Sequence, residues 1–418
     1  MSRLKIQGGR KLRGRLQVSG MKNAATPILA AALLTDEPCI LHRIPRIRDV
    51  DRILEILRSL GATAEWVGDH DVRVEAKHVS LQGLDRKAMR SLRSSALLLG
   101  PMLARFREVE LPEPGGCIIG NRPLDTHIYA LVKLGARYIK SGDAHHLSAE
   151  KLRGCLVVLP EFSVTATENL MMAAALAEGT TVVKLAAAEP HVEDLGHFLV
   201  AMGAKIKGLG THTLTIEGVP KLHGAEYTII PDQIEAGTFL IAAALMRGDL
   251  RVEGIRPDHL DIVFQTLESL GADVRVGEDW AEVAAPATLQ AFKLQTMPYP
   301  GVPTDLMAPF GVLATQCSGT TFIHEKMFDG RFGFLNELIK MGANAVISDP
   351  HRAFVTGPTP LYGREVRSLD LRAGITLLLA ALLADGETVI HDAEIIDRGY
   401  ERIEDRLNQV GASITREE

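Results

Sequence analysis

Residues 54–66, LEILRSLGATAEW, show the pattern that decides the fold: an apolar run with helical spacing passes through Gly61-Ala62 into an alternating run typical of a strand. The pattern recurs with its glycine at positions 135, 203, 271, 342 and 411, so the intervals are 74, 68, 68, 71 and 69 residues. A fixed period of this length indicates one supersecondary unit used repeatedly, each copy covering the apolar face of its neighbours.

Each unit contains a second helix-to-strand step, in which an Ala-rich run is followed by glycine and a β-branched strand. These steps lie at 173–183, 242–252, 311–323 and 379–390, with looser copies at 30–41 and 96–111. Alanine and leucine favour helix, glycine is expected as a left-handed C-cap, and Thr, Val and Ile favour the strand. The sequence therefore predicts an α/β protein of six βαβαββ-like repeats with parallel, right-handed crossovers. Three repeats would form each of two lobes, with the Ala-rich helices inside, and ligands favour clefts between lobes.

The composition is that of an ordinary globular protein. The chain has 418 residues, 46% hydrophobic and 23% charged, and its net charge is −6. This charge argues against a generic nucleic-acid binder, which needs a basic face. The N-terminal apolar stretch at 27–34 is far shorter than the roughly 20 residues that cross a bilayer. No charged segment and hydrophobic run typical of a leader peptide precede it, so we expect a cytoplasmic protein.

The spacing of cysteine and histidine predicts no metal site. Cys39, Cys117, Cys155 and Cys317 are scattered without a CxxC pair, which favours reduced thiols over a disulfide framework. His145-His146 is expected in an exposed hairpin turn. We therefore expect no metal cofactor.

Four segments break the repeat and are the candidates for chemistry. The first is residues 18–25, VSGMKNAA, in which Gly20 permits a turn and Lys22 and Asn23 lie at the expected start of a helix. A helix N-terminus beside a lysine suits a phosphate or a carboxylate. A surface lysine in a turn would give the same local pattern.

The second segment is residues 111–127, LPEPGGCIIGNRPLDTH, whose prolines and glycines exclude a regular helix or strand. Cys117 lies at its centre, with Arg122 and His127 close in sequence. A nearby cation lowers the pKa of a thiol, so a loop cysteine here suits proton delivery or a covalent adduct. An inert buried cysteine is the alternative.

The third and fourth segments carry an acid and two arginines. Asp305 follows a proline turn at the head of an expected helix, where it would serve either as a helix cap or as a base for a substrate hydroxyl. Arg372 begins another expected helix, and Arg398 lies in the segment 397–402, DRGYER. These arginines suit an oxyanion clamp, although ordinary salt bridges would also explain them.

These segments, taken in order, resemble the UDP-N-acetylglucosamine 1-carboxyvinyltransferase family of enolpyruvyl transferases over essentially the whole chain. The matching segments are 19–24 SGMKNA, 44–51 IPRIRDVD, 92–95 LRSS, 115–123 GGCIIGNRP, 231–239 PDQIEAGTF, 303–305 PTD, 370–372 DLR and 397–405 DRGYERIED. The resemblance implies an inside-out α/β barrel of two domains. One domain would span residues 22–230, with the Cys117 loop. The other would combine residues 1–21 with 231–418 and carry Asp305, Arg372 and Arg398.

The resemblance also implies a reaction, in which the enolpyruvyl group of phosphoenolpyruvate moves to the 3′-hydroxyl of UDP-N-acetylglucosamine and phosphate leaves. No cofactor is implied, because protonation of the methylene makes the enol ether carbon electrophilic. Cys117 corresponds to the loop acid and fosfomycin target, and Asp305 to the base. Lys22, Arg122 and Arg398 correspond to phosphoenolpyruvate ligands, with Arg372 near its carboxylate. The positions that hold the nucleotide sugar are Asn23, Arg93, Arg122, Pro123, Leu124, Asp125, Ser163, Val164, Asp305 and Met327.

The sequence departs from the family pattern at a few positions. Met21 and Thr165 replace small residues, and Glu113-Pro114 extends the cysteine loop. Thr165 affects the expected fit on the uridine side, and Glu113 would raise the pKa of the thiol if it faces the site. Two alternatives stay open. One is an enzyme like 3-phosphoshikimate 1-carboxyvinyltransferase, whose pattern lacks the Gly-Gly-Cys loop, and the other is a silent paralogue that binds UDP-N-acetylglucosamine and regulates through a partner.

Overall fold

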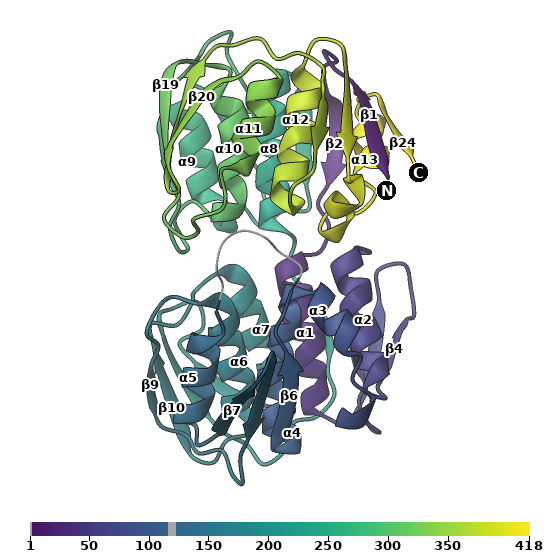
Figure 1. The fold of residues 1–418 in the computed structure, drawn as a ribbon, viewed down its shortest axis with the longest axis vertical. Helices are drawn as coiled ribbons and strands as arrows, with labels where there is room; N and C mark the ends of the chain where they lie inside the picture. The colour runs from purple at the N-terminus through teal and green to yellow at the C-terminus, as the bar shows by residue number, and fades with distance from the viewer. Residues whose placement is uncertain (1, 116–122) are drawn as a thin grey trace. The chain divides into compact units, whose positions relative to one another are not determined.

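The computed structural model describes residues 2–115 and 123–418, which form two compact units (Figure 1). The terminal unit contains residues 2–19 and 231–418, and the central unit contains the described residues between 20 and 230. Within the described part of the chain, no helix is both long enough and apolar enough to cross a membrane.

The terminal unit has three sheets. The strand order in the first sheet is β22 (Glu365–Arg367), β23 (Glu387–His391), β1 (Arg3–Gln7) and β24 (Ile414–Glu417). The order in the second is β15 (Asp273–Val276), β16 (Trp280–Ala284), β14 (Asp249–Glu253) and β2 (Arg13–Gln17). The order in the third is β17 (Leu289–Gln290), β19 (Cys317–His324), β21 (Arg352–Gly357) and β20 (Asn344–Asp349), and β18 (Lys293–Gln295) also pairs with β19. The two N-terminal strands thus complete sheets made by the C-terminal half of the chain: β2 runs parallel to β14, and β1 pairs with β23 and β24.

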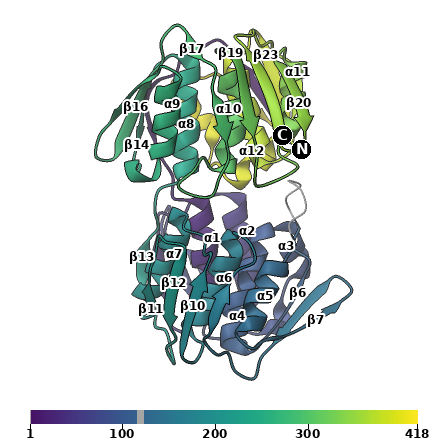
Figure 2. The same cartoon turned by 90° about the vertical axis from the view of Figure 1, so that its left-hand side faces the viewer.

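Three buried helices pack against one another in this unit: α8 (Gln233–Met246), α10 (Thr304–Ala314) and α12 (Leu371–Leu383). Every residue of α8 is buried. Figures 1 and 2 show these helices side by side with the strands outside them. The remaining helices are α9 (Asp261–Ser269), α11 (Gly333–Lys340) and α13 (Ile403–Gln409). Small alanine side chains allow this close approach of helices, as the sequence predicts.

The central unit repeats the plan. Its strand orders are β11 (Lys205–Lys207), β12 (Thr213–Glu217), β10 (Thr180–Lys184) and β9 (Leu156–Val158); β13 (Glu226–Thr228), β3 (Cys39–His42), β5 (Val72–Glu75) and β4 (Thr63–Trp66); and β6 (Glu108–Pro112), β8 (Ala144–Ser148) and β7 (Arg137–Ser141). Its helices are α1 (Lys22–Ala31), α2 (Arg48–Ser59), α3 (Arg86–Ser91), α4 (Leu99–Phe106), α5 (Asp125–Lys133), α6 (Val164–Ala175) and α7 (Pro190–Ala201).

The expected βαβαββ repeat is present. The order β9, α6, β10, α7, β11, β12 gives a sheet in which β9 and β10 are parallel and β12 is antiparallel to β10. The order β18, α10, β19, α11, β20, β21 gives the same relations in the terminal unit. The predicted fold class, an inside-out α/β fold with three repeats per unit, is confirmed.

The Gly-Ala glycines occupy the same backbone conformation in all six repeats. Their φ values lie between 96° and 109°, and each glycine follows the cap residue of α2, α5, α7, α9, α11 or α13. This left-handed region costs glycine little, so the glycine ends each helix and turns the chain into the next strand.

The prediction that a glycine caps the C-terminus of each Ala-rich helix is wrong. Helix α8 ends on Arg247, which itself adopts the left-handed conformation with φ 47°. Gly179 and Gly386 have positive φ but lie beyond the caps of α6 and α12, and Gly319 lies within β19. These glycines shape the entry into the strand, after the helix has already ended.

Candidate functional site

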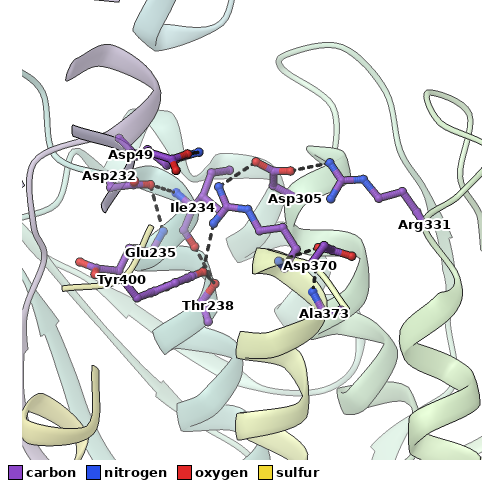
Figure 3. Close-up of polar contacts among 12 residues, drawn as sticks. Asp49, Asp232, Ile234, Glu235, Thr238, Asp305, Arg331, Asp370, Ala373 and Tyr400 are labelled. Atoms are coloured by element: carbon purple, nitrogen blue, oxygen red, sulfur yellow. Dashed lines mark hydrogen bonds and ion pairs between the residues drawn. The ribbon is translucent and has the colours of Figure 1, made fainter. Parts of the chain in front are cut away.

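Asp305 forms the centre of a polar cluster in the terminal unit. It is the second residue of α10. The N-cap of this helix is Pro303, and no side chain makes a capping hydrogen bond there. Its Oδ1 accepts a hydrogen bond from Arg331 Nη2 at 2.9 Å, and its Oδ2 accepts one from Arg372 Nη2 at 2.8 Å (Figure 3). The helix-cap interpretation of Asp305 is therefore not the one the structure supports, because both carboxylate oxygens face guanidinium groups.

Arg372 is held at the start of α12. The Asp370 carboxylate accepts hydrogen bonds from the amides of Arg372 and Ala373, which caps the helix as expected for this position. Arg372 Nη1 donates to Tyr400 Oη at 3.2 Å, and Tyr400 Oη lies 3.0 Å from Thr238 Oγ1. Three helices of the unit's core and the segment after η5 (Ala393–Arg398) thus share one network.

Two groups in this network have shifted pKa values. Burial alone would lower the pKa of the Arg372 guanidinium, but the charge of Asp305 together with the other groups around Arg372 outweighs burial and raises the pKa above its usual value. Burial raises the pKa of the Tyr400 hydroxyl to about 12, so Tyr400 is a neutral hydrogen-bonding group. The cluster consequently brings one carboxyl group together with two guanidinium groups.

Sequence reasoning missed Arg331 and named only its neighbour Met327. Arg331 is 9% exposed and lies in the segment between β19 and α11. The amide of Met327 donates to the carboxylate of Glu325 at 2.7 Å. No spacing in the sequence indicates that Arg331 faces Asp305, since the two positions are 26 residues apart.

Arg398 ends η5, and its neighbourhood is held by salt bridges. Arg416 on β24 contacts Asp397 at 2.8 Å and Glu404 of α13 at 2.6 Å. Arg398 itself is half-buried. Asp397 in the DRGYER segment therefore fixes the backbone on which the predicted ligand Arg398 lies.

Lys22 and Asn23 begin α1 in the central unit, as the sequence predicts. Lys22 Nζ lies 2.9 Å from Asp49 Oδ2, and Asp49 in α2 is 4% exposed. Arg93 begins the short helix η3 (Arg93–Leu98) in the same unit. The lysine is therefore oriented by a buried carboxylate and is not a loose surface residue.

The starts of α5 and α6 lie together and hold four predicted binding residues. Leu124 is the N-cap of α5 and Asp125 its first residue, while Ser163 is the N-cap of α6 and Val164 its first residue. Pro123, which precedes them, is exposed. Two hydrogen bonds tie the helix starts: Thr126 Oγ1 donates to Glu161 Oε1 at 2.7 Å, and His127 Nε2 lies 2.7 Å from Thr165 Oγ1.

Cys117 and Arg122 lie outside the described residues. Of the departures from the family pattern, Thr165 uses its hydroxyl to contact His127, and the Glu113 carboxylate lies 2.7 Å from His145 Nε2. His145 and His146 were expected in a hairpin turn, and this is wrong: both lie in β8, and His145 is 3% exposed because its ring packs between Tyr138 and Glu113. No group of three possible metal ligands occurs among residues 2–115 and 123–418.

The three described cysteines are free thiols with raised pKa values. Burial raises the pKa of Cys39 and of Cys155, and it raises the pKa of Cys317 to about 12. Since the thiolate is the nucleophile, none of these three suits covalent chemistry at neutral pH.

Sequence comparisons find related proteins over nearly the whole chain. The EPSP synthase (3-phosphoshikimate 1-carboxyvinyltransferase) family matches residues 6–407. A UDP-N-acetylglucosamine 1-carboxyvinyltransferase of Bradyrhizobium diazoefficiens is 46% identical over 98% of this chain and 97% of the relative. One of Koribacter versatilis is 46% identical over 100% of this chain and 96% of the relative.

Two solved structures are similar to this chain over nearly its whole length. The enolpyruvyl transferase NikO from Streptomyces tendae is 28% identical, with a TM-score of 0.90 over 99% of this chain and 98% of that one. EPSP synthase from Acinetobacter baumannii is 21% identical, with a TM-score of 0.74 over the whole of both chains, which supports the fold alone.

Proposed function

Because this chain belongs to the enolpyruvyl transferase family, alongside relatives named UDP-N-acetylglucosamine 1-carboxyvinyltransferase, we propose that it transfers the enolpyruvyl group of phosphoenolpyruvate to the 3′-hydroxyl of UDP-N-acetylglucosamine. Phosphate is the second product. This reaction supplies a precursor of peptidoglycan. Both substrates are anions that a bilayer excludes, so the proposal includes a cytoplasmic location.

The observation that carries the proposal is the arrangement at Asp305. Its two oxygens each accept a hydrogen bond from a buried arginine, Arg331 or Arg372. Such charge-assisted bonds keep the carboxylate ionised and fix its direction. Asp305 accordingly serves as the base that accepts the proton of the sugar hydroxyl.

The second part of the proposal concerns phosphoenolpyruvate. Lys22, Arg122 and Arg398 bind this trianion, and Arg372 lies near its carboxylate. Cys117 protonates the methylene, which places positive charge on the neighbouring carbon and permits attack by the hydroxyl. The departing phosphate gains charge, so cations already in place lower the barrier. The pairing of Lys22 with buried Asp49 supports this role, because it holds the ammonium before substrate arrives.

The nucleotide sugar is assigned to Asn23, Arg93, residues 122–125, Ser163, Val164 and Met327. The joined starts of α5 and α6 support this assignment, because the unbonded amides of a helix N-terminus favour a phosphate.

Phosphate release tests the proposal. The protein should release phosphate from phosphoenolpyruvate when UDP-N-acetylglucosamine is present and should release none with shikimate 3-phosphate. Release with shikimate 3-phosphate would instead identify the sister activity. Tight sugar-nucleotide binding without turnover would identify a silent paralogue. The relatives at 44–46% identity favour neither alternative.

A second test addresses Cys117. Fosfomycin should alkylate Cys117 and leave Cys39, Cys155 and Cys317 unmodified, because burial raises the pKa of each of these three thiols. Peptide mass spectrometry gives the site directly. Cys117→Ala should fold and lose turnover. An unmodified Cys117 at saturating fosfomycin, or full activity in the alanine variant, would remove its role as the acid.

A further inference from the structure

Glu325 is a wholly buried carboxylate that accepts four hydrogen bonds. It directly follows β19 and is 0% exposed. Its Oε1 accepts from Thr296 Oγ1 at 2.9 Å, from the Met327 amide at 2.7 Å and from the Phe328 amide at 3.2 Å, while its Oε2 accepts from Thr304 Oγ1 at 2.7 Å. No ion pair to it is found in the part of the chain that the structure describes. The four donors satisfy the buried carboxylate and link it to other segments of the chain.

The backbone of Glu325 is fixed as firmly as its side chain. Its amide donates to the carbonyl of His351 at 2.8 Å, and its own carbonyl accepts from His351 Nδ1 at 2.8 Å. Thr296 Oγ1, which donates to Glu325, accepts from the Lys326 amide at 2.8 Å. The position of the Glu325 carboxylate is therefore fixed by its own backbone, and the carboxylate in turn fixes the positions of the groups that donate to it.

Three of the four donors lie on the two segments that carry the Asp305 pair, and the fourth, Thr296, directly follows β18. Thr304 immediately precedes Asp305 and opens α10. Met327 and Phe328 begin the segment that ends at Arg331, whose guanidinium contacts Asp305 at 2.9 Å. Glu325 thus closes a ring that runs through Thr304, Asp305 and Arg331 and back along the chain.

We infer that Glu325 is a positioning residue: its hydrogen bonds to Thr304 and to the amides of Met327 and Phe328 set the distance and direction between Asp305 and Arg331. The inference rests on the proposed function, in which Asp305 is the base. Glu325 touches neither substrate in this scheme and acts only through these neighbours.

Two substitutions at Glu325 separate the effect of side-chain length from the effect of charge. Glu325→Gln keeps the reach: its oxygen still accepts from the two amides, and its NH2 group donates to the Thr304 hydroxyl. Glu325→Asp keeps the charge but is one methylene too short to serve both segments. We expect Glu325→Asp to lower kcat about 10- to 100-fold, the size of effect that a misplaced catalytic group produces. Glu325→Gln should lower kcat less. A greater loss in Glu325→Gln would overturn the inference.

Thr304 provides an independent test. Thr304→Val removes the hydroxyl that joins α10 to Glu325 and should lower kcat, whereas Thr304→Ser keeps the hydroxyl and should restore it. Thr315→Val is the control at the other end of α10, because the buried Thr315 hydroxyl contacts only the Val312 carbonyl and the Gln316 side chain among the described residues. Equal kcat in Thr304→Val and wild type would overturn the inference.

One measurement does not depend on turnover. Hydrogen exchange at the amides of Met327 and Phe328 should be faster in Glu325→Asp than in Glu325→Gln, and equal rates would overturn the inference. If the wild-type protein releases no phosphate with UDP-N-acetylglucosamine, the proposed function fails, and this exchange measurement still decides whether Glu325 organises the segment.

Discussion

The two units use the same scaffold but arrange the polar groups at their helix starts differently. In the terminal unit, one connected network joins Asp305, Arg331, Arg372 and Tyr400 across several elements. In the central unit, Lys22 pairs with Asp49, and two hydrogen bonds join the starts of α5 and α6. The repeat thus determines where helices begin, and the individual residues determine whether those beginnings act together.

Removing the centre of the terminal network should have the largest effect. Asp305→Asn leaves two buried guanidinium groups without a counter-charge, which costs about 3–5 kcal/mol of unfolding free energy for a broken buried pair. Loss of the base should lower kcat about 10²- to 10⁴-fold. Chemical denaturation and phosphate release measure the two effects. Asp249→Asn, in the same unit with a side chain 90% exposed, is the control and should match wild type. A small stability change in Asp305→Asn would show that the network is not cooperative.

Tyr400 tests how far the network extends. Tyr400→Phe removes the acceptor for Arg372 and should cost about 1–3 kcal/mol, the penalty for a buried group left unpaired. It should also lower kcat, because Arg372 contacts Asp305. The matched variant is Tyr227→Phe in the central unit, which removes a 2.6 Å hydrogen bond to Asp194 and should reduce stability alone. Equal kcat values in the two variants would show that Tyr400 does not influence catalysis through Arg372.

A single contact in the central unit should matter less. Thr165→Val removes the hydroxyl that contacts His127 but keeps the branched shape, so it should cost about 1 kcal/mol. Because this contact ties the starts of α5 and α6, the KM for UDP-N-acetylglucosamine should rise while kcat stays near wild type. A fall in kcat with unchanged KM would argue against a role in sugar-nucleotide binding.

The smallest effect concerns a histidine found at equivalent places in both units. His42 ends β3 and faces Glu226 on parallel β13, just as His391 ends β23 and faces Glu365 on parallel β22. Only His42 also contacts Asp71, at 2.8 Å. The hydrogen bond that His42 donates to Asp71, and next the one that it donates to Glu226, raises the pKa of His42 above its usual 6.5.

The direction of the pH dependence follows from that raised pKa. Charged His42 stabilises the fold fully below the unfolded-state pKa near 6.5, and this contribution is lost as pH rises through the folded-state pKa. The Tm difference between wild type and Asp71→Asn should therefore be largest in mild acid and shrink at alkaline pH. A difference that grows with pH would contradict this account.

The sequence predicts the scaffold well because the scaffold is repetitive. A glycine such as Gly61 is needed in every copy for the same backbone reason, so its period is visible without a structure. The ends of the Ala-rich helices are less predictable, because Arg247 adopts a left-handed conformation that only its tertiary setting stabilises.

The site is predictable only in part, and the reason is sequence distance. Lys22, Asp305 and Arg372 are placed correctly at helix starts, where local signals exist. Arg331 and Glu325 have no local signal, since the side chains that they contact lie 21 to 29 residues away along the chain. Only the folded chain brings such groups together.

The N-terminal strands have a consequence for the order of synthesis. Strand β1 finds both of its neighbours in residues 387–417, whereas residues 20–230 supply the central unit without help from later sequence. At about 5–20 residues per second, translation leaves β1 waiting roughly 20–80 s for its sheet. The central unit is therefore free to fold on the ribosome while β1 stays unpaired, and the terminal unit becomes complete only when residues 387–417 have been synthesised.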